Sequence, residues 1–272
     1  MSALPPGRDA EPCPNCGHCV QGKYCSECGQ KHGGVRVTLG SIVHELLDEF
    51  FHFDAKLVQT LRPLFFQPGR LSLDYWAGKR ARFMRPLQLY LAAAFLFFFA
   101  AQFVQAQVLM VKVDAKTEVS ALKEDDPQGS LLEKKLDAYI RSHDAAQISK
   151  DVVTSVSEQF PKVMFGAIPL FALLCMGLFR RSHRFYAEHF IFALHFHAFV
   201  FLSGLIRLPL PKWLSQALLL VYPVYLGLAL HRAYGESIPR TVLKLVALTA
   251  IYLTVLGSAV AAIAISHMLG VF

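Results

Sequence analysis

Four cysteines near the N-terminus form two matched pairs whose spacing suits metal chelation. They occur as Cys13-Pro-Asn-Cys16-Gly and Cys25-Ser-Glu-Cys28-Gly. Two C-x-x-C-G knuckles on a short spacer can present four thiolates tetrahedrally to one zinc ion. The glycine after each second cysteine allows the backbone to turn tightly toward the metal. The spacing therefore predicts a zinc ribbon, with Cys13, Cys16, Cys25 and Cys28 as ligands and a structural Zn²⁺ as the cofactor.

A fifth cysteine, Cys19, leaves two alternatives open. It extends the first pair to C-x-x-C-x-x-C, a run that resembles the cluster-binding run of ferredoxins. Those sequences place the fourth cysteine three residues later and follow it with proline. Here Cys25 comes six positions after Cys19 and precedes serine. Disulfide or redox use would need an oxidising compartment. Zinc is favoured over both alternatives, with Cys19 as the spare thiol.

The charge around the cysteines argues against nucleic acid as a partner. Residues 1–34 contain three basic and three acidic residues, and Tyr24 is their only aromatic residue. Binding to phosphates requires a basic surface. A site closed by four cysteines is also structural rather than catalytic. The ribbon is therefore expected to contact a protein.

A second constellation lies in the apolar C-terminal half: Glu188, His189, His195 and His197. Ionisable side chains inside a membrane segment are costly, so these four are candidates for binding a metal or haem or for relaying protons. In the alternative interpretation, neutral histidines bond to neighbouring helices and Glu188 pairs with Arg184 one turn earlier. The alternative is favoured because no partner set in the C-terminal part completes a ligand shell.

The composition indicates an integral membrane protein that is all-α. Hydrophobic residues make up 54% of the 272 residues and charged residues only 17%. Five apolar segments approach the length of a 30 Å hydrocarbon core, although the second is short for it. These predicted spans are 86–109, 163–179, 190–208, 213–230 and 242–268. Because the second is marginal in length, the alternative is four spans with a re-entrant segment at 163–179.

Basic residues near the span ends predict the orientation. Arginine and lysine precede the first span and lie between spans two and three and between spans four and five. The segment 110–162 is mildly acidic, with 8 basic and 10 acidic residues. We therefore expect a multi-pass protein with a cytoplasmic N-terminus and an external C-terminus. A cytoplasmic location also keeps the cysteines reduced.

The chain is expected to divide into four parts. Residues 1–12 form a disordered leader, 13–34 the ribbon, 35–85 amphipathic cytoplasmic or interfacial helices, and 86–272 the membrane domain. Within 35–85, apolar residues recur at helical spacing over 38–66, and Gln67-Pro68-Gly69 ends the helix. Within the membrane domain, 110–162 is an external loop with helical character.

An ordered series of motifs resembles a known family. The series is C-P-N-C-G, Y-C-S-E-C-G-Q, F-F-H-F-D, T-L-R-P-L, Q-P-G-R, Y-W-A-G-K-R, M-R-P-L and E-H-F-I-F-A-L-H-F-H-A-F. It resembles domain of unknown function 3667, over about residues 13–100 and 186–200. The resemblance implies a bacterial inner-membrane protein with an N-terminal zinc ribbon whose ligands are the four paired cysteines. It also draws attention to the cluster from Glu188 to His197.

These features favour a non-enzymatic role. The sequence contains no nucleotide-binding loop, no Ser-His-Asp pattern and no H-E-x-x-H motif. The leading hypothesis is a bilayer-embedded protein whose cytoplasmic ribbon docks a protein partner or organises the inner face. Alternatives are a small transporter or channel that uses the polar residues of span three, and a haem- or metal-dependent membrane enzyme. The sequence leaves oligomer formation open.

Overall fold

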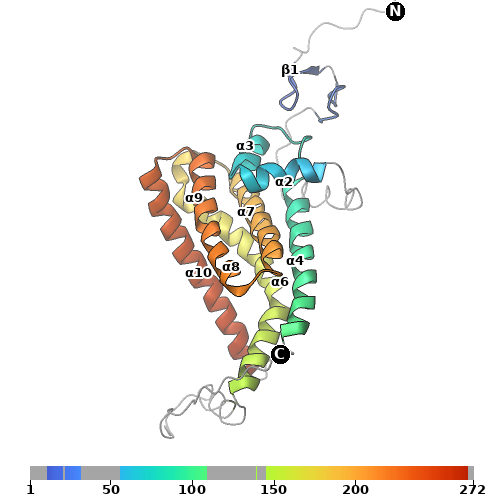
Figure 1. Ribbon diagram of the computed structural model, residues 1–272. Coiled ribbons are helices and arrows are strands. Elements are labelled where there is room, and N and C mark those ends of the chain that lie inside the picture. The colour runs from blue at the N-terminus through green and yellow to red at the C-terminus, as the bar shows by residue number, and fades with distance from the viewer. Residues whose placement is uncertain (1–10, 21, 32–55, 109–138, 140–144, 269–272) are drawn as a thin grey trace, which may run out of the picture.

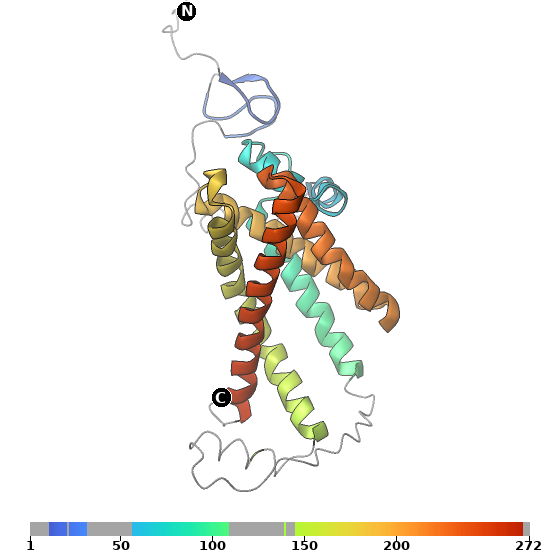
Figure 2. The ribbon, with the colours of Figure 1, turned by 90° about the vertical axis from the view of Figure 1, so that its left-hand side faces the viewer.

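The computed structural model describes residues 11–20, 22–31, 56–108, 139 and 145–268. A small cysteine-containing ribbon lies at one end of a helical bundle, and two short helices, α2 and α3, lie between them (Figures 1 and 2). The ribbon contains strands β1 (Glu11–Pro12) and β2 (Cys19–Val20). The helices are α2 (Lys56–Phe66), α3 (Arg70–Trp76), α4 (Pro86–Val108), α6 (Ala145–Leu178), α7 (Tyr186–Arg207), α8 (Lys212–Ala217), α9 (Val221–Tyr234) and α10 (Ile238–Met268), with 3-10 turns η1 (Arg180–Ser182) and η2 (Leu218–Leu220).

Helix α7 is the centre of the bundle. It packs against α4 on one side and α6 on another. Phe201 of α7 lies 5.8 Å from the Tyr90 ring of α4, and Phe196 stacks on Phe171 of α6 at 5.4 Å between ring centroids. In the most apolar 18 residues of α7, 61% of the residues are buried, compared with 22% in the α8–α9 segment and 11% in α10. The apolar composition of α7 is therefore explained by protein packing.

Helices α9 and α10 turn apolar side chains outward. Exposed residues include Val224 and Leu228 on α9 and Leu243 and Val246 on α10. An apolar surface of this kind is stable against lipid and costly in water. Among the described residues, three helices are long and apolar enough to cross a membrane: Tyr186–Arg207, Lys212–Tyr234 and Ile238–Ser266. The prediction of a mostly helical protein with membrane-spanning segments is thereby confirmed, whereas the count of five spans stays a prediction.

The described parts of α4 and α6 give shorter apolar segments, Pro86–Ala101 and Lys162–Leu178. Helix α6 begins at residue 145, well before the predicted span at 163, so the end of the predicted external loop is helical. The first half of α6 contains many polar residues, so a search for long apolar segments does not detect this part of the helix. Likewise, residues 11 and 12 form a strand where a leader was expected.

Other predicted boundaries agree with the structure. Helix α4 begins at Pro86, and α2 ends at Phe66, directly before the predicted stop. Gly69 has φ 78°, and a Cβ atom there would lie 2.7 Å from the carbonyl oxygen of Ala229, so this turn requires glycine. Residues 1–10 of the predicted leader, 38–55 of the predicted helix and 110–138 of the predicted external loop lie outside the described residues.

Three hydrogen bonds fix α2, α3 and the loop that follows them on the end of the bundle. The Thr60 hydroxyl accepts a bond from the backbone N–H of Met84 at 2.9 Å, and the Tyr225 hydroxyl donates to the Leu64 carbonyl at 2.6 Å. The Trp76 indole donates to the carbonyl of Glu188 at 3.2 Å. These contacts hold the loop between α3 and α4 at the end of the bundle that faces the ribbon.

Candidate metal centre

The two cysteine knuckles have the same local construction. In the first, the N–H of Cys13 donates to His18 O and the N–H of Gly17 donates to Cys13 O, both at 2.8 Å. In the second, Cys25 and Gly29 make the equivalent bonds, to Gln30 O and Cys25 O. Gly17 and Gly29 have φ values of 81° and 69°, a conformation that favours glycine. The predicted role of these glycines in tight turns is confirmed.

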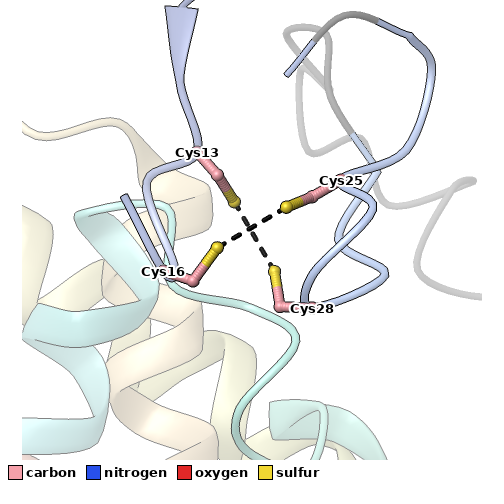
Figure 3. A group of neighbouring side chains, drawn as sticks. All are labelled: Cys13, Cys16, Cys25 and Cys28. Atoms are coloured by element: carbon pink, nitrogen blue, oxygen red, sulfur yellow. Dashed lines mark hydrogen bonds between the residues drawn. The ribbon is translucent and has the colours of Figure 1, made fainter. Parts of the chain in front are cut away.

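The four paired cysteines point toward one centre (Figure 3). The Sγ atoms of Cys13 and Cys28 are 3.6 Å apart, and those of Cys16 and Cys25 are 3.5 Å apart. All four sulfur atoms lie within 4.8 Å of one another. A tetrahedral ion with bonds of about 2.3 Å to sulfur requires sulfur separations of about 3.8 Å. The four cysteines therefore form a group that can bind a metal ion.

The Cys16 and Cys28 thiols differ in pKa because their hydrogen bonds and desolvation differ. The pKa of Cys28 falls to about 6: burial raises it, but hydrogen bonds from Asn15, the backbone at Gln30 and neighbouring thiols outweigh burial. The pKa of Cys16 rises to about 12, because burial and the neighbouring thiols outweigh a backbone hydrogen bond at His18 that lowers it. A divalent cation would favour the thiolate form of all four.

Cys19 lies apart from this group. It is exposed and pairs with Pro12 across the two-stranded sheet. Among the described residues, the metal-capable group of histidine, cysteine and acidic side chains consists of Cys13, Cys16, Cys25 and Cys28. This placement matches the interpretation of Cys19 as the spare thiol.

Gln30 connects the second knuckle to the loop between α3 and α4. Its side-chain amide donates to the carbonyl of Gly78 at 2.8 Å and accepts from the N–H groups of Arg80 and Ala81 at 3.0 and 3.2 Å. Gly78 has φ 84°, and a Cβ atom on it would lie 3.2 Å from Cβ of Pro14 in the first knuckle. We call these contacts between Gln30 and residues 78–81 the ribbon clasp.

Glu188 has a structural role at the start of α7. Its carboxylate forms an ion pair with Arg184 at 3.0 Å and accepts the N–H of Phe185 at 2.9 Å. A carboxylate at this position caps a helix N-terminus and interacts favourably with its dipole. The pairing with Arg184 is the one that the sequence predicted.

The three histidines of α7 bond to three different helices. His195 Nδ1 lies 3.0 Å from Ser72 Oγ on α3, and His189 Nδ1 lies 2.7 Å from the Tyr234 hydroxyl on α9. His197 donates from Nδ1 to the carbonyl of Ala193, which leaves Nε2 to accept from the Tyr252 hydroxyl of α10 at 2.7 Å. The histidines therefore do not converge on a common centre in the described residues.

Sequence reasoning did not identify Gln30, Gly78, Ser72, Tyr234 and Tyr252. Each forms a hydrogen bond with a residue at least 40 positions away in the chain. Gln30 follows C-S-E-C-G in one of the quoted motifs, but the sequence does not indicate which loop it contacts. Contacts at such separations follow from tertiary packing and leave no local pattern.

The segment from α2 to the first half of α4 matches a known family. Residues 54–98, which include α2, α3 and the first half of α4, match the family described as "Protein of unknown function (DUF3667)". The chain belongs to the DUF3667 family. The match confirms the resemblance for these residues, and the cysteine ribbon of this DUF3667 member lies before the matched segment.

The C-terminal half gives a second match. Residues 136–272 match the family described as "Transition state regulatory protein AbrB", and because this is half of the chain, the DUF3667 member belongs to that family as well. The regulatory name belongs to the family and not to this chain. No curated protein and no solved structure matches the chain.

Proposed function

We propose that this DUF3667 member is a bacterial inner-membrane protein whose ribbon holds Zn²⁺ and organises the cytoplasmic face for a protein partner. In this proposal α4, α6, α7, α8–α9 and α10 are five spans. The N-terminus is cytoplasmic and the C-terminus external.

Helix length and charge support the topology. Helix α4 has 23 residues and α6 has 34, so at 1.5 Å per residue both are about 34 Å or longer, enough for a hydrocarbon core. Lys79, Arg80 and Arg82 lie in the loop that the ribbon contacts, at the cytoplasmic side expected for basic residues. A cytoplasmic ribbon also keeps its thiols reduced.

The ribbon clasp is the observation that carries the proposal. Gln30 accepts the backbone N–H of Cys25 with its carbonyl while its side chain holds residues 78–81. A metal bound by Cys25 and Cys28 would fix the knuckle and thereby orient Gln30. Metal binding would thereby position the loop at residues 78–81 through the side chain of Gln30.

The surface of the ribbon supports a protein as partner. Tyr24 is 61% exposed, and aromatic side chains are enriched at protein interfaces. Three basic and three acidic residues in positions 1–34 give no net charge to attract phosphates. The proposed partner of the ribbon is therefore a cytoplasmic protein.

Two measurements test this function. Elemental analysis of the purified full-length protein should find one zinc per chain, which is lost in Cys13→Ser/Cys16→Ser and retained in Cys19→Ser. A photo-cross-linker placed at Tyr24 should trap a cytoplasmic protein in cells. Absence of zinc from the wild type would refute the metal assignment, and an unchanged interaction profile after ribbon deletion would refute the docking role.

A further inference from the structure

A large cavity opens between the helices at the end of α7 that is far from the ribbon. Its volume is about 840 Å³, within the range of about 300–1,000 Å³ of small-molecule sites. Helices α4, α6, α7, α9 and α10 all contribute to its wall. The wall is mostly apolar and aromatic, including Phe97, Phe171, Phe201, Leu226 and Leu253.

The cavity has one cationic end. Arg207, the last residue of α7, and Lys212, the first residue of α8, both line it. Among the described residues no carboxylate pairs with either side chain, and none lines the cavity. The sequence between Glu188 and Glu236 contains no aspartate or glutamate at all.

Three hydrogen bonds orient the Arg207 side chain. Nε donates to Ser215 O at 3.0 Å, Nη1 to the Tyr222 hydroxyl at 3.0 Å and Nη2 to Ser215 Oγ at 3.2 Å. A guanidinium has five N–H donors, so two remain for a ligand. A positioned arginine with free donors and no counter-charge is suited to bind an anionic oxygen group.

The His197–Tyr252 pair on the opposite wall offers no free donor to a ligand. His197 and Tyr252 line this wall, but they bond to each other at 2.7 Å, and the second ring nitrogen of His197 bonds to Ala193 O. Their donors are therefore already used. Residues 197 and 207 are ten positions apart on α7, which corresponds to about 15 Å of helix.

This depth decides the kind of ligand. About 15 Å is half of a 30 Å hydrocarbon core, the thickness of one leaflet. If α7 spans the bilayer as proposed, the cations at its end lie at the level of lipid head groups, and the apolar wall extends toward the bilayer centre. We propose that the cavity binds an anionic membrane lipid, with its phosphate at Arg207 and Lys212 and an acyl chain along Phe201 and Leu226. The proposal rests on the membrane spans of the proposed function and not on the ribbon or its zinc.

Lipid binding to the full-length protein tests the proposal. The protein is delipidated in mild detergent and titrated with phosphatidylglycerol or with phosphatidylcholine of identical acyl chains, and bound lipid is counted by native mass spectrometry. We expect one phosphatidylglycerol to bind about tenfold or more tightly than phosphatidylcholine. Arg207→Gln should abolish this preference, whereas Arg181→Gln, the same charge change on an exposed residue at the other end of α7, should preserve it.

Two further variants decide the result if Arg207→Gln does not fold. Lys212→Gln should reduce the preference several-fold, and Val200→Trp, which fills the cavity, should prevent binding of both lipids at this site. Neither residue takes part in the bonds between Arg207 and Ser215. Equal binding of the two lipids by the wild type would overturn the proposal, as would a preference that survives both variants. Inorganic phosphate that displaces the anionic lipid at millimolar concentration would overturn the lipid assignment and indicate a site for a free anion.

Discussion

Removal of the Gln30 side chain should release the ribbon from the membrane domain without loss of the metal. Gln30→Ala deletes three hydrogen bonds to Gly78, Arg80 and Ala81. A hydrogen bond contributes a net 0.5–1.5 kcal/mol, and these bonds are partly accessible to water, so the docked state should lose about 2–3 kcal/mol. The docking equilibrium should therefore weaken about 30- to 140-fold. The cysteines and their backbone bonds remain, so zinc content should stay at one per chain.

Hydrogen exchange measured by mass spectrometry on the purified protein would detect this change. The amides of Arg80 and Ala81 should exchange faster in Gln30→Ala, whereas peptides from the centre of α7 should not change. Lys31→Ala is the matched control, because Lys31 is the exposed neighbour and uses only its backbone in the bridge to Tyr24. If exchange at residues 79–82 is the same in Gln30→Ala as in the control, the ribbon clasp does not hold the loop and the argument from Gln30 fails.

Four further outcomes can be measured independently. Cys25→Ser should lose the bound metal, as elemental analysis would detect, because serine offers no thiolate and the site then has three sulfur ligands. Acidification should release the metal only below about pH 6, because the pKa of Cys28, which is lowered to about 6 without a cation, falls further when a cation is bound; a zinc-sensitive dye would detect release, and release at neutral pH would contradict this reasoning. Tyr252→Phe leaves Nε2 of His197 without its partner and should destabilise the protein by about 1–3 kcal/mol in thermal denaturation, with no change in metal content. Gly69→Ala should also lower the melting temperature, by clash and by a strained φ, while substitution at Gly166, where a Cβ would meet nothing within 4 Å, is the control.

Local chemistry made part of this structure predictable. The knuckles depend on cysteine and glycine spacing within five residues, and the start of α4 at Pro86 and the end of α2 before Gln67 depend on proline and glycine. The clasp was not predictable, because Gln30 meets its partners 48 to 51 positions later. The cavity was also not predictable, because its wall comes from several helices and basic residues such as Arg207 and Lys212 are common at the ends of membrane spans.

The histidines of α7 show why a polar residue in a membrane segment does not by itself indicate chemistry. Helices in lipid gain little from burial against one another, so interhelical hydrogen bonds have a larger share in choosing the arrangement. His195 bonds to α3, His189 to α9 and His197 to α10, and one central helix thereby contacts three neighbours through three separate side chains. Each bond satisfies a polar group that would otherwise be costly to bury. A substitution such as His189→Leu should therefore impair packing of α9 and stability together, whereas loss of lipid binding at unchanged stability should follow only from residues of the Arg207 cavity.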